Sequence, residues 1–164
     1  MTVLSRTRVL EGITARVIFD VATHQGTLLE RTFDFYAQDK QGNVWYVGEN
    51  TTHYLPSGQK DKSGSWQAEI NGEPGIIMEA NPQIPDAYRQ EFQRGVAEDT
   101  AWVVHRGGSV TVPYGTLDHV LHSLEATRVE PGSYDEKVYA PGIGIAVERS
   151  LTSSETSELV SVTG

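Results

Sequence analysis

The residues best suited to acid–base chemistry lie in one acidic and aromatic stretch, Tyr88–Trp102. Glu91 precedes Gly95, and Glu98 and Asp99 follow it, so two strands that pair across Gly95 would bring Glu91 within reach of Glu98 or Asp99. Two carboxylates in one cleft can divide the acid and base roles, because their repulsion raises the pKa of one of them. Separations of about 5 Å or about 6.5–9.5 Å would suit glycoside hydrolysis. A competing interpretation is an ordinary ion pair between Glu91 and a neighbouring arginine at a solvated strand surface.

His119 and His122 are the only close pair among the five histidines. On a helix they could share a metal ion with Asp118 and Glu125 nearby. The segment 116–129 fits a helix and a strand, and its β-branched end favours a strand, on which positions i and i+3 point to opposite faces. We therefore expect no metal site, no cofactor, and no change of melting temperature with zinc. His24, His53 and His105 are expected on the surface or in turns.

Asp39–Asn43 has oxygen-bearing side chains at alternating positions, as a calcium loop does, but Glu49 comes too early to serve as the bidentate ligand. The same string is typical of a hairpin turn in which Gly42 adopts a positive φ. We predict the hairpin.

Aromatic side chains are a further candidate for binding, since rings supply contact area and a hydroxyl or indole N–H supplies orientation. They could line a concave ligand site, or they could be ordinary core residues. The candidates are Trp45, Tyr46, Trp66, Tyr88, Trp102, Tyr134 and Tyr139.

Composition excludes several classes of function. The absence of cysteine removes disulfides, thiolate metal sites and cysteine nucleophiles, and a net charge of −9 makes nucleic acid an unsuitable partner. No apolar run is long enough for a transmembrane helix. The sequence lacks a Gly-x-Ser-x-Gly elbow, a His-Glu-x-x-His motif and a glycine-rich phosphate loop.

The elements that must position these residues are strands. Apolar and polar residues alternate with period two in Ile13–Val21 and Leu29–Ala37, and Asn43–Asn50 continues the pattern as a meander. Three prolines argue against a central strand or a helix in Ile76–Asp86, which we interpret as a crossing segment. The 164 residues are predicted to form a single all-β domain of about ten antiparallel strands, with 1–11 and 152–164 as candidates for fraying.

Several segments resemble a family of bacterial exported proteins and lipoproteins of unknown function, with the pattern YAQDxxGNVWYxGE … VPxGTFxxxL … YAPGVGxV. Such proteins are thought to be related to the outer-membrane lipoprotein-carrier fold. The resemblance implies a strongly curved antiparallel sheet, or half-open β-barrel, with a concave apolar face, and a place in the cell envelope or outside the cell. This sequence has no export signal, lacks the N-terminal segment that usually precedes the first strand, and has Leu117 where an aromatic is usual. The matching segments are Tyr36–Glu49, Pro74–Met78, Tyr88–Glu91, Ala97–Asp99, Val110–Asp118 and Tyr139–Gly144.

Three functions follow as hypotheses. The first is a non-catalytic domain that binds an apolar or amphiphilic small molecule, or a protein partner, on an aromatic concave face. The second is a small hydrolase or lyase that acts on sugar-like substrates with Glu91 and either Glu98 or Asp99. The third is a structural module of the cell envelope without a pocket.

Overall fold

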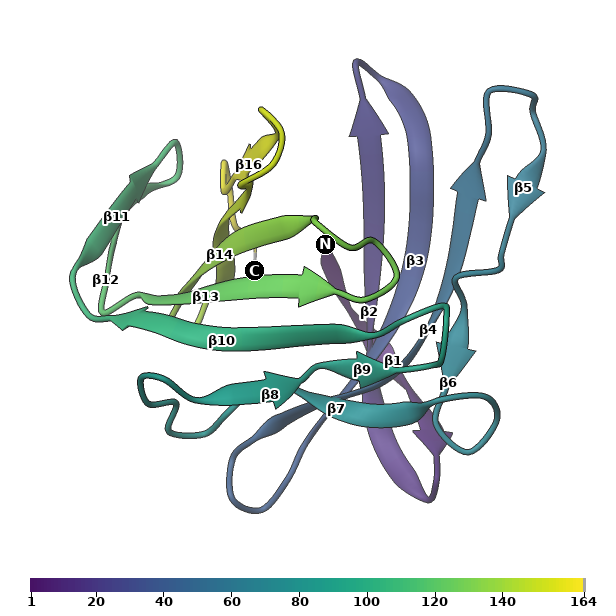
Figure 1. Cartoon of the computed structure of the whole chain (residues 1–164), viewed down its shortest axis with the longest axis horizontal. Helices are drawn as coiled ribbons and strands as arrows, with labels where there is room; N and C mark the ends of the chain where they lie inside the picture. The colour runs from purple at the N-terminus through teal and green to yellow at the C-terminus, as the bar shows by residue number, and fades with distance from the viewer. Residues whose placement is uncertain (164) are drawn as a thin grey trace. The chain divides into compact units, whose positions relative to one another are not determined.

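The computed structural model describes residues 1–163, and within them it contains antiparallel sheets and no helix (Figure 1). The all-β prediction is confirmed. No sheet of these residues is closed or strongly curled, so the predicted curved sheet or half-open barrel is not confirmed. The strands are β1 (Thr2–Leu10), β2 (Ile13–His24), β3 (Thr27–Gln38), β4 (Val44–Tyr54), β5 (Lys60–Asp61), β6 (Trp66–Gln67), β7 (Glu73–Met78), β8 (Ala87–Arg89), β9 (Glu91–Phe92), β10 (Asp99–Arg106), β11 (Ser109–Val112), β12 (Gly115–Asp118), β13 (Leu121–Thr127), β14 (Tyr134–Ala140), β15 (Gly144–Ser150) and β16 (Thr156–Glu158).

The chain divides into two compact units that alternate along the sequence. The first comprises Met1–Ala80 and Arg89–Glu98, and the second comprises Asn81–Tyr88 and Asp99–Gly164. Each unit contains segments from two parts of the chain, so neither can be cut out as one continuous stretch. The single domain expected from length stays a prediction.

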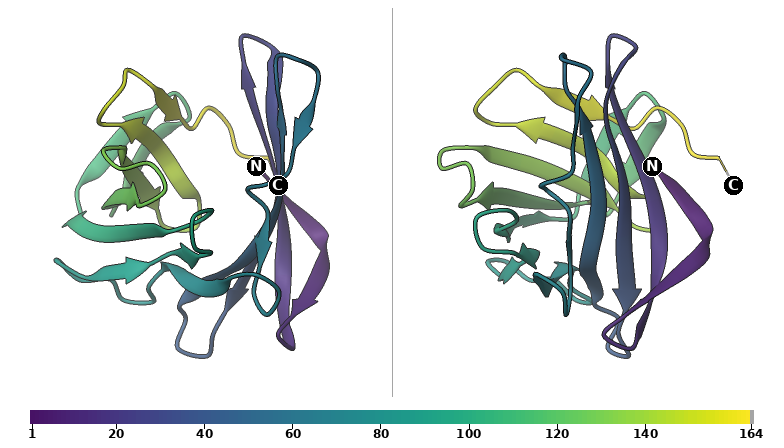
Figure 2. Two further views of the ribbon diagram at one scale, coloured as in Figure 1. Left: turned by 45° about the vertical axis from the view of Figure 1, so that its right-hand side comes forward. Right: turned by 90° about the vertical axis from the view of Figure 1, so that its right-hand side faces the viewer.

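The first unit is built on one large sheet in the order β1-β2-β3-β4-β7-β9, with β5 and β6 also paired to β4. Its long strands β1 to β4, purple to blue in Figure 2, run side by side as the predicted meander, which β1 extends by one strand. Gly42 has a φ of 99° in the turn between β3 and β4, which confirms the predicted hairpin. The core of this unit is formed by Leu10, Ala15, Val17, Phe35, Val47 and Ala68.

The second unit is built on a sheet in the order β16-β15-β14-β13-β10-β8, together with the small hairpin β11-β12. The predicted strand over 116–129 is present but broken, because His119 adopts a positive φ of 57° between β12 and β13. The core of this unit is formed by Val112, Val120, Val138, Ala140, Ala146 and Val147.

Residues 1–11 contain β1, which pairs with β2 and buries Leu10 with Ala15 and Val17. Fraying of the two ends of the chain stays a prediction. The structure corrects one expectation about pairing. The crossing segment begins later than expected, since β7 runs to Met78 between β4 and β9. Strand pairing is compatible with the prolines because only Pro74 lies within β7, near its start.

Candidate functional site

A groove crosses one face of the first unit's sheet, over β1 to β4. It consists of two adjoining hollows of about 690 Å³ and 410 Å³, which share Phe33 and Asn50 in their walls. Strand register explains why these side chains lie on one face of the sheet. Phe33 is the partner of Phe19 on one side and of Asn50 on the other, and such partners point to the same face. We call it the basic groove, and its further lining residues are Arg6, Thr7, Arg8, Val17, Arg31, Phe35, Thr51, Thr52, Tyr54, Lys62 and Ser65.

Aromatic rings and cationic side chains are interleaved in the basic groove. Phe19 and Phe33 stack with their ring centroids 4.8 Å apart, and the guanidinium of Arg6 lies 4.7 Å from the centroid of Phe33. Such contacts hold a charged side chain against an apolar surface while its N–H groups remain available to a ligand. The same kind of contact joins Arg8 to Phe35 at 5.0 Å, Arg31 to Tyr54 at 5.8 Å and Lys60 to Tyr54 at 5.4 Å.

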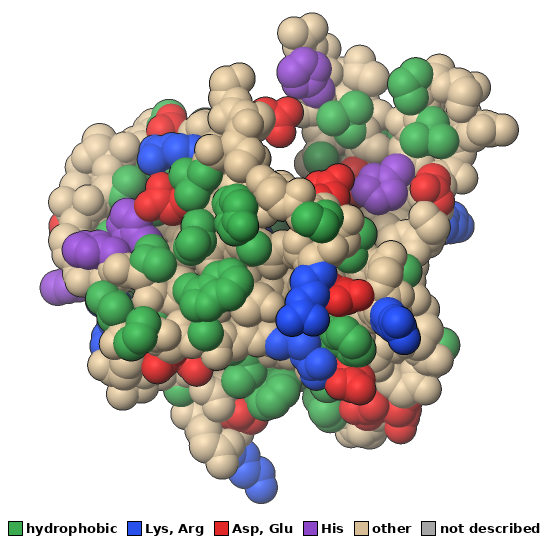
Figure 3. All heavy atoms as spheres, viewed as in Figure 1, with side chains coloured by type: hydrophobic (Ala, Val, Ile, Leu, Met, Phe, Trp, Pro, Cys, Tyr) green, Lys and Arg blue, Asp and Glu red, His purple; other side chains and the backbone are tan. Residues whose placement is uncertain are grey.

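The charge of the basic groove is opposite to that of the chain. Its walls contain Arg6, Arg8, Arg31 and Lys62, and no aspartate or glutamate is among the described residues that line it. The chain as a whole carries a net charge of −9. Figure 3 draws one face of the molecule, on which acidic, basic and hydrophobic side chains all occur. A recess lined by one sign of charge raises the local concentration of ligands of the other sign.

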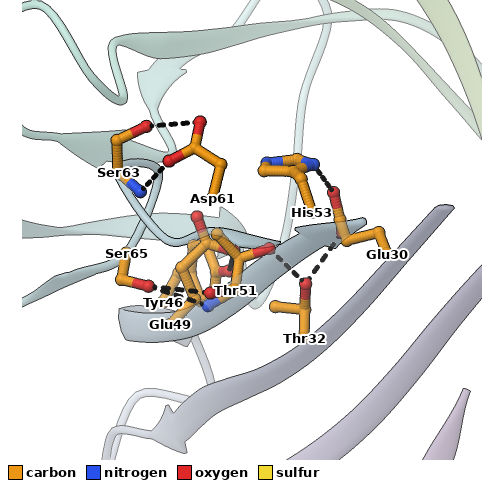
Figure 4. Close-up of polar contacts among 9 residues, drawn as sticks. All are labelled: Glu30, Thr32, Tyr46, Glu49, Thr51, His53, Asp61, Ser63 and Ser65. Carbon is orange, nitrogen blue, oxygen red and sulfur yellow. Dashed lines mark hydrogen bonds and ion pairs between the residues drawn. The ribbon is translucent and has the colours of Figure 1, made fainter. Parts of the chain in front are cut away.

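The loop that carries Lys62 is fastened to the sheet by hydrogen bonds, as Figure 4 shows. The Ser65 hydroxyl donates to the backbone carbonyl of Thr51 at 3.1 Å and accepts from its backbone N–H at 3.0 Å. At the other end of the loop, Asp61 accepts from the backbone N–H and the hydroxyl of Ser63, and these bonds lower the pKa of Asp61. The wall of the basic groove that contains Lys62 is therefore anchored to β4.

On the opposite side of β3 lies a cluster that we call the tyrosine–carboxylate cluster, made of Asp34, Tyr46 and Glu49. Asp34 alternates with the groove residues Phe33 and Phe35, so its side chain points away from the groove. The Tyr46 hydroxyl lies 2.6 Å from Asp34 Oδ1 and 3.2 Å from Glu49 Oε2.

Burial governs the protonation of this cluster. It raises the pKa of Asp34 from 3.8 to about 6, against the lowering effect of the hydrogen bond from Tyr46, and the nearby charges of Asp20 and Glu30 raise it further. Burial also raises the pKa of the Tyr46 hydroxyl. The tyrosine therefore keeps its proton, and the Asp34 carboxyl group, with a pKa of about 6, lies on the sheet face opposite the groove.

The carboxylates predicted from sequence have separate partners in the structure. Glu91 is buried and its Oε2 accepts the indole N–H of Trp66 at 2.6 Å. Glu98 accepts the backbone N–H of Gly95 at 2.7 Å, at the exposed turn. Asp99 begins β10. The catalytic pairing of these residues stays a prediction.

The strand pair expected across Gly95 is reduced to a single bridge between Gln93 and Ala97. Instead, β9 pairs with β7, which places Glu91 opposite Pro74. The reason is packing, since this pairing puts Glu91 against the core indole of Trp66.

The seven predicted aromatic residues occupy different kinds of position. In the first unit, Trp66 is 1% exposed and meets Tyr46 edge to face, and the half-buried Trp45 donates its indole N–H to Asp39. In the second unit, the Tyr139 hydroxyl donates to Glu125 at 3.1 Å. Tyr88 is buried there, whereas Trp102 and Tyr134 are exposed. None of the seven lines the basic groove.

The residues that were considered from sequence as ligands of a cation lie in turns and on strands. Asp39 accepts hydrogen bonds from the indole N–H of Trp45, from the side-chain amide of Asn43, and from the backbone N–H groups of Asn43 and Gln41, and these lower its pKa to about 2. His119 lies in the turn before β13 and His122 lies on that strand. Among residues 1–163, no group of three or more histidine, aspartate and glutamate side chains is placed to hold a metal ion.

The groove residues were missed from sequence, although a signal for them exists. Arg31 and Phe33 alternate on β3, and Arg6 and Arg8 alternate on β1, so each pair shares a strand face. What the spacing does not give is the register that places the two pairs, with Phe19, on one surface. That register depends on an irregularity in β1 between Val3 and Thr7.

Comparison with known proteins adds no identification, since no family model, curated protein or solved structure matches this chain. The resemblance to exported bacterial lipoproteins therefore stays a prediction. No helix within residues 1–163 is long and apolar enough to cross a membrane.

Proposed function

We propose that this protein is a binding domain whose basic groove takes an amphiphilic small molecule that carries an anionic group. The observation that carries the proposal is the set of cationic side chains stacked on aromatic rings along an open groove of about 690 Å³ and its 410 Å³ continuation. The rings of Phe19, Phe33 and Tyr54 would contact the apolar body of the ligand. Arg31 and Lys62 would contact its carboxylate, sulfonate or phosphate.

This proposal keeps the predicted class of function and changes the residues. A strongly curved, lipoprotein-carrier-like sheet is not required, because the groove lies on an open sheet between side chains of β1 to β4. The hydrolase or lyase alternative stays a second proposal. The binding function is better supported, because Glu91 is buried and held by Trp66.

A pair of fluorescent probes tests the proposal. The protein is titrated with 8-anilinonaphthalene-1-sulfonate, which is anionic, and with N-phenyl-1-naphthylamine, which has the same rings without the charge. We expect Arg31→Gln and Lys62→Gln each to weaken binding of the sulfonate roughly tenfold, since each removes a charge-assisted contact, and to leave the neutral probe nearly unaffected. Phe33→Ala should weaken both probes.

Lys40→Gln, in the β3–β4 turn outside the groove, is the matched charge control and should bind both probes as the unaltered protein does. Circular dichroism and the melting temperature show that each variant is folded. Equal sulfonate binding by Arg31→Gln, Lys62→Gln and Lys40→Gln would contradict the proposal. Turnover of p-nitrophenyl glycosides that is lost in Glu91→Gln and kept in Phe33→Ala would establish the enzyme alternative.

A further inference from the structure

We propose that His105 and His122 form a binding site for a divalent transition-metal ion of the zinc type on the second unit's sheet. The two residues are partners in the register between β10 and β13. Their rings are perpendicular, with centroids 5.1 Å apart. Partners on neighbouring strands point to the same face of a sheet, so both imidazoles lie on one face.

The spacing of the rings fits shared coordination. Zinc is held by imidazole nitrogens at about 2.0–2.1 Å in a tetrahedral arrangement, and two rings bound in this way have centroids roughly 5 Å apart. The separation of 5.1 Å between His105 and His122 agrees with this value. Water or a ligand of the ion would complete the coordination.

Hydrogen bonds already orient one of the two imidazoles. His122 Nδ1 lies 2.8 Å from Glu136 Oε1, and Arg149 donates to the other oxygen of Glu136 at 3.1 Å. Because an ionised carboxylate only accepts hydrogen bonds, Nδ1 carries the proton and Nε2 presents its lone pair. Metal-binding histidines are oriented by carboxylates in this manner. Glu136 is thus a positioning residue for His122.

A β-bulge creates the pair. From Asp99 to Val103, β10 keeps one register with β13, and the register then shifts so that His105 faces His122. Without the extra residue, Val104 would face His122 and His105 would face Leu121. Bulges commonly redirect a side chain in this way at functional positions.

The site is open to solvent. His105 is exposed, and the side chain of His122 is 25% exposed. In Figure 3, histidine side chains (purple) gather at the left of the view, where Figure 1 places the end of β10 and the start of β13. An ion can therefore reach the site without rearrangement of the core.

Calorimetric titration of the full chain with zinc chloride at pH 7.5 tests the proposal. We expect one saturable site, whose affinity falls at least about tenfold in His105→Asn and in His122→Asn, since each removes one ligand. His119→Asn is the matched control and should bind zinc as the unaltered protein does, since asparagine tolerates the positive φ of that turn.

The positioning role of Glu136 is tested by the zinc affinity of two further variants. Glu136→Ala should weaken zinc binding by about tenfold, and Glu136→Gln should restore it, because an amide oxygen still accepts the N–H of His122. Melting temperatures with and without zinc supply an independent measurement for every variant, and zinc should raise the melting temperature only of variants that retain the site. This reverses the expectation from the sequence, which considered only the pairing of His119 with His122. Absence of saturable zinc binding, or binding that persists in both His105→Asn and His122→Asn, would overturn the proposal.

Discussion

Tyr46 in the first unit and Tyr139 in the second both donate their hydroxyl hydrogen to a buried carboxyl group. The hydroxyl of Tyr46 lies 2.6 Å from Asp34, and that of Tyr139 lies 3.1 Å from Glu125. Burial raises the pKa of both tyrosines, so each keeps its proton. The surroundings differ, because Lys137 Nζ lies 2.9 Å from Glu125.

The charges that act on Asp34 are of the opposite kind. Asp20 and Glu30 are acidic, and together with burial they raise the pKa of Asp34 to about 6. Each pair thus consists of a tyrosine and a buried carboxyl group, and the two differ in the charges around the carboxyl group. Lys137 forms an ion pair with Glu125 in the second unit, whereas burial and acidic neighbours raise the pKa of Asp34 in the first.

The largest expected effect is the pH dependence that Asp34 confers. Its pKa in the folded protein, about 6, exceeds the ordinary 3.8, so its contribution to stability is fully present below about pH 4 and is lost as the pH rises through 6. The loss amounts to about 3 kcal/mol in the free energy of unfolding. Asp34→Asn should remove this part of the slope in urea denaturation between pH 4 and pH 7.

Asp39→Asn is the control for Asp34→Asn. The pKa of Asp39 is lowered, so its contribution changes below pH 4 and with the opposite sign. The slope between pH 4 and pH 7 should survive in this variant. An identical slope in Asp34→Asn and in the unaltered protein would contradict the pH dependence of stability that is assigned to Asp34.

Glu125→Gln should show the next largest effect, a loss of about 2 kcal/mol in the free energy of unfolding at pH 7. The substitution removes the carboxylate that lies 2.9 Å from Lys137 Nζ, nearer than the 3.5 Å contact with Glu148, and removing one member of a buried ion pair is costly. Because Glu148 is 46% exposed, Glu148→Gln is the matched control and should change stability by less than about 1 kcal/mol. Guanidinium denaturation of both variants measures the difference, and equal stabilities would refute the role given to Lys137.

Removal of the hydroxyls should have the smallest effect on stability. Tyr46→Phe and Tyr139→Phe should each cost about 1 kcal/mol, the usual value of one hydrogen bond. Tyr46→Phe should also raise the pKa of Asp34 above about 6, because the lost hydrogen bond lowers that pKa. Carbon-13 NMR of the Asp34 carboxyl measures this shift, and an unchanged titration midpoint would contradict it.

Much of the fold follows from local pattern. Period-two alternation predicted the centres of β2, β3 and β4, and a positive φ at Gly42 was required by the turn between them. The pairing of β7 with β9 could not be predicted from local pattern, because it depends on where Trp66 is buried. The division into two alternating units has no local signal either.

The sites were predicted less well than the fold, for a related reason. A side chain's face on a strand can be read from sequence, but its cross-strand neighbour depends on register, and one bulge changes that neighbour. The bulge before His105 therefore hid the pairing with His122. The partners of Phe33 in the basic groove depend in the same way on how β2 and β4 pair with β3.

The irregular pairing of β1 has a consequence for self-association. β1 is the edge strand of the large sheet, and the exposed Val3 and Val9 make such an edge a potential template for another chain. The register shift between Val3 and Thr7 interrupts the row of backbone groups that an incoming strand would have to match. The irregularity therefore opposes edge-to-edge aggregation, and a variant that straightened β1 would be expected to precipitate at lower concentrations.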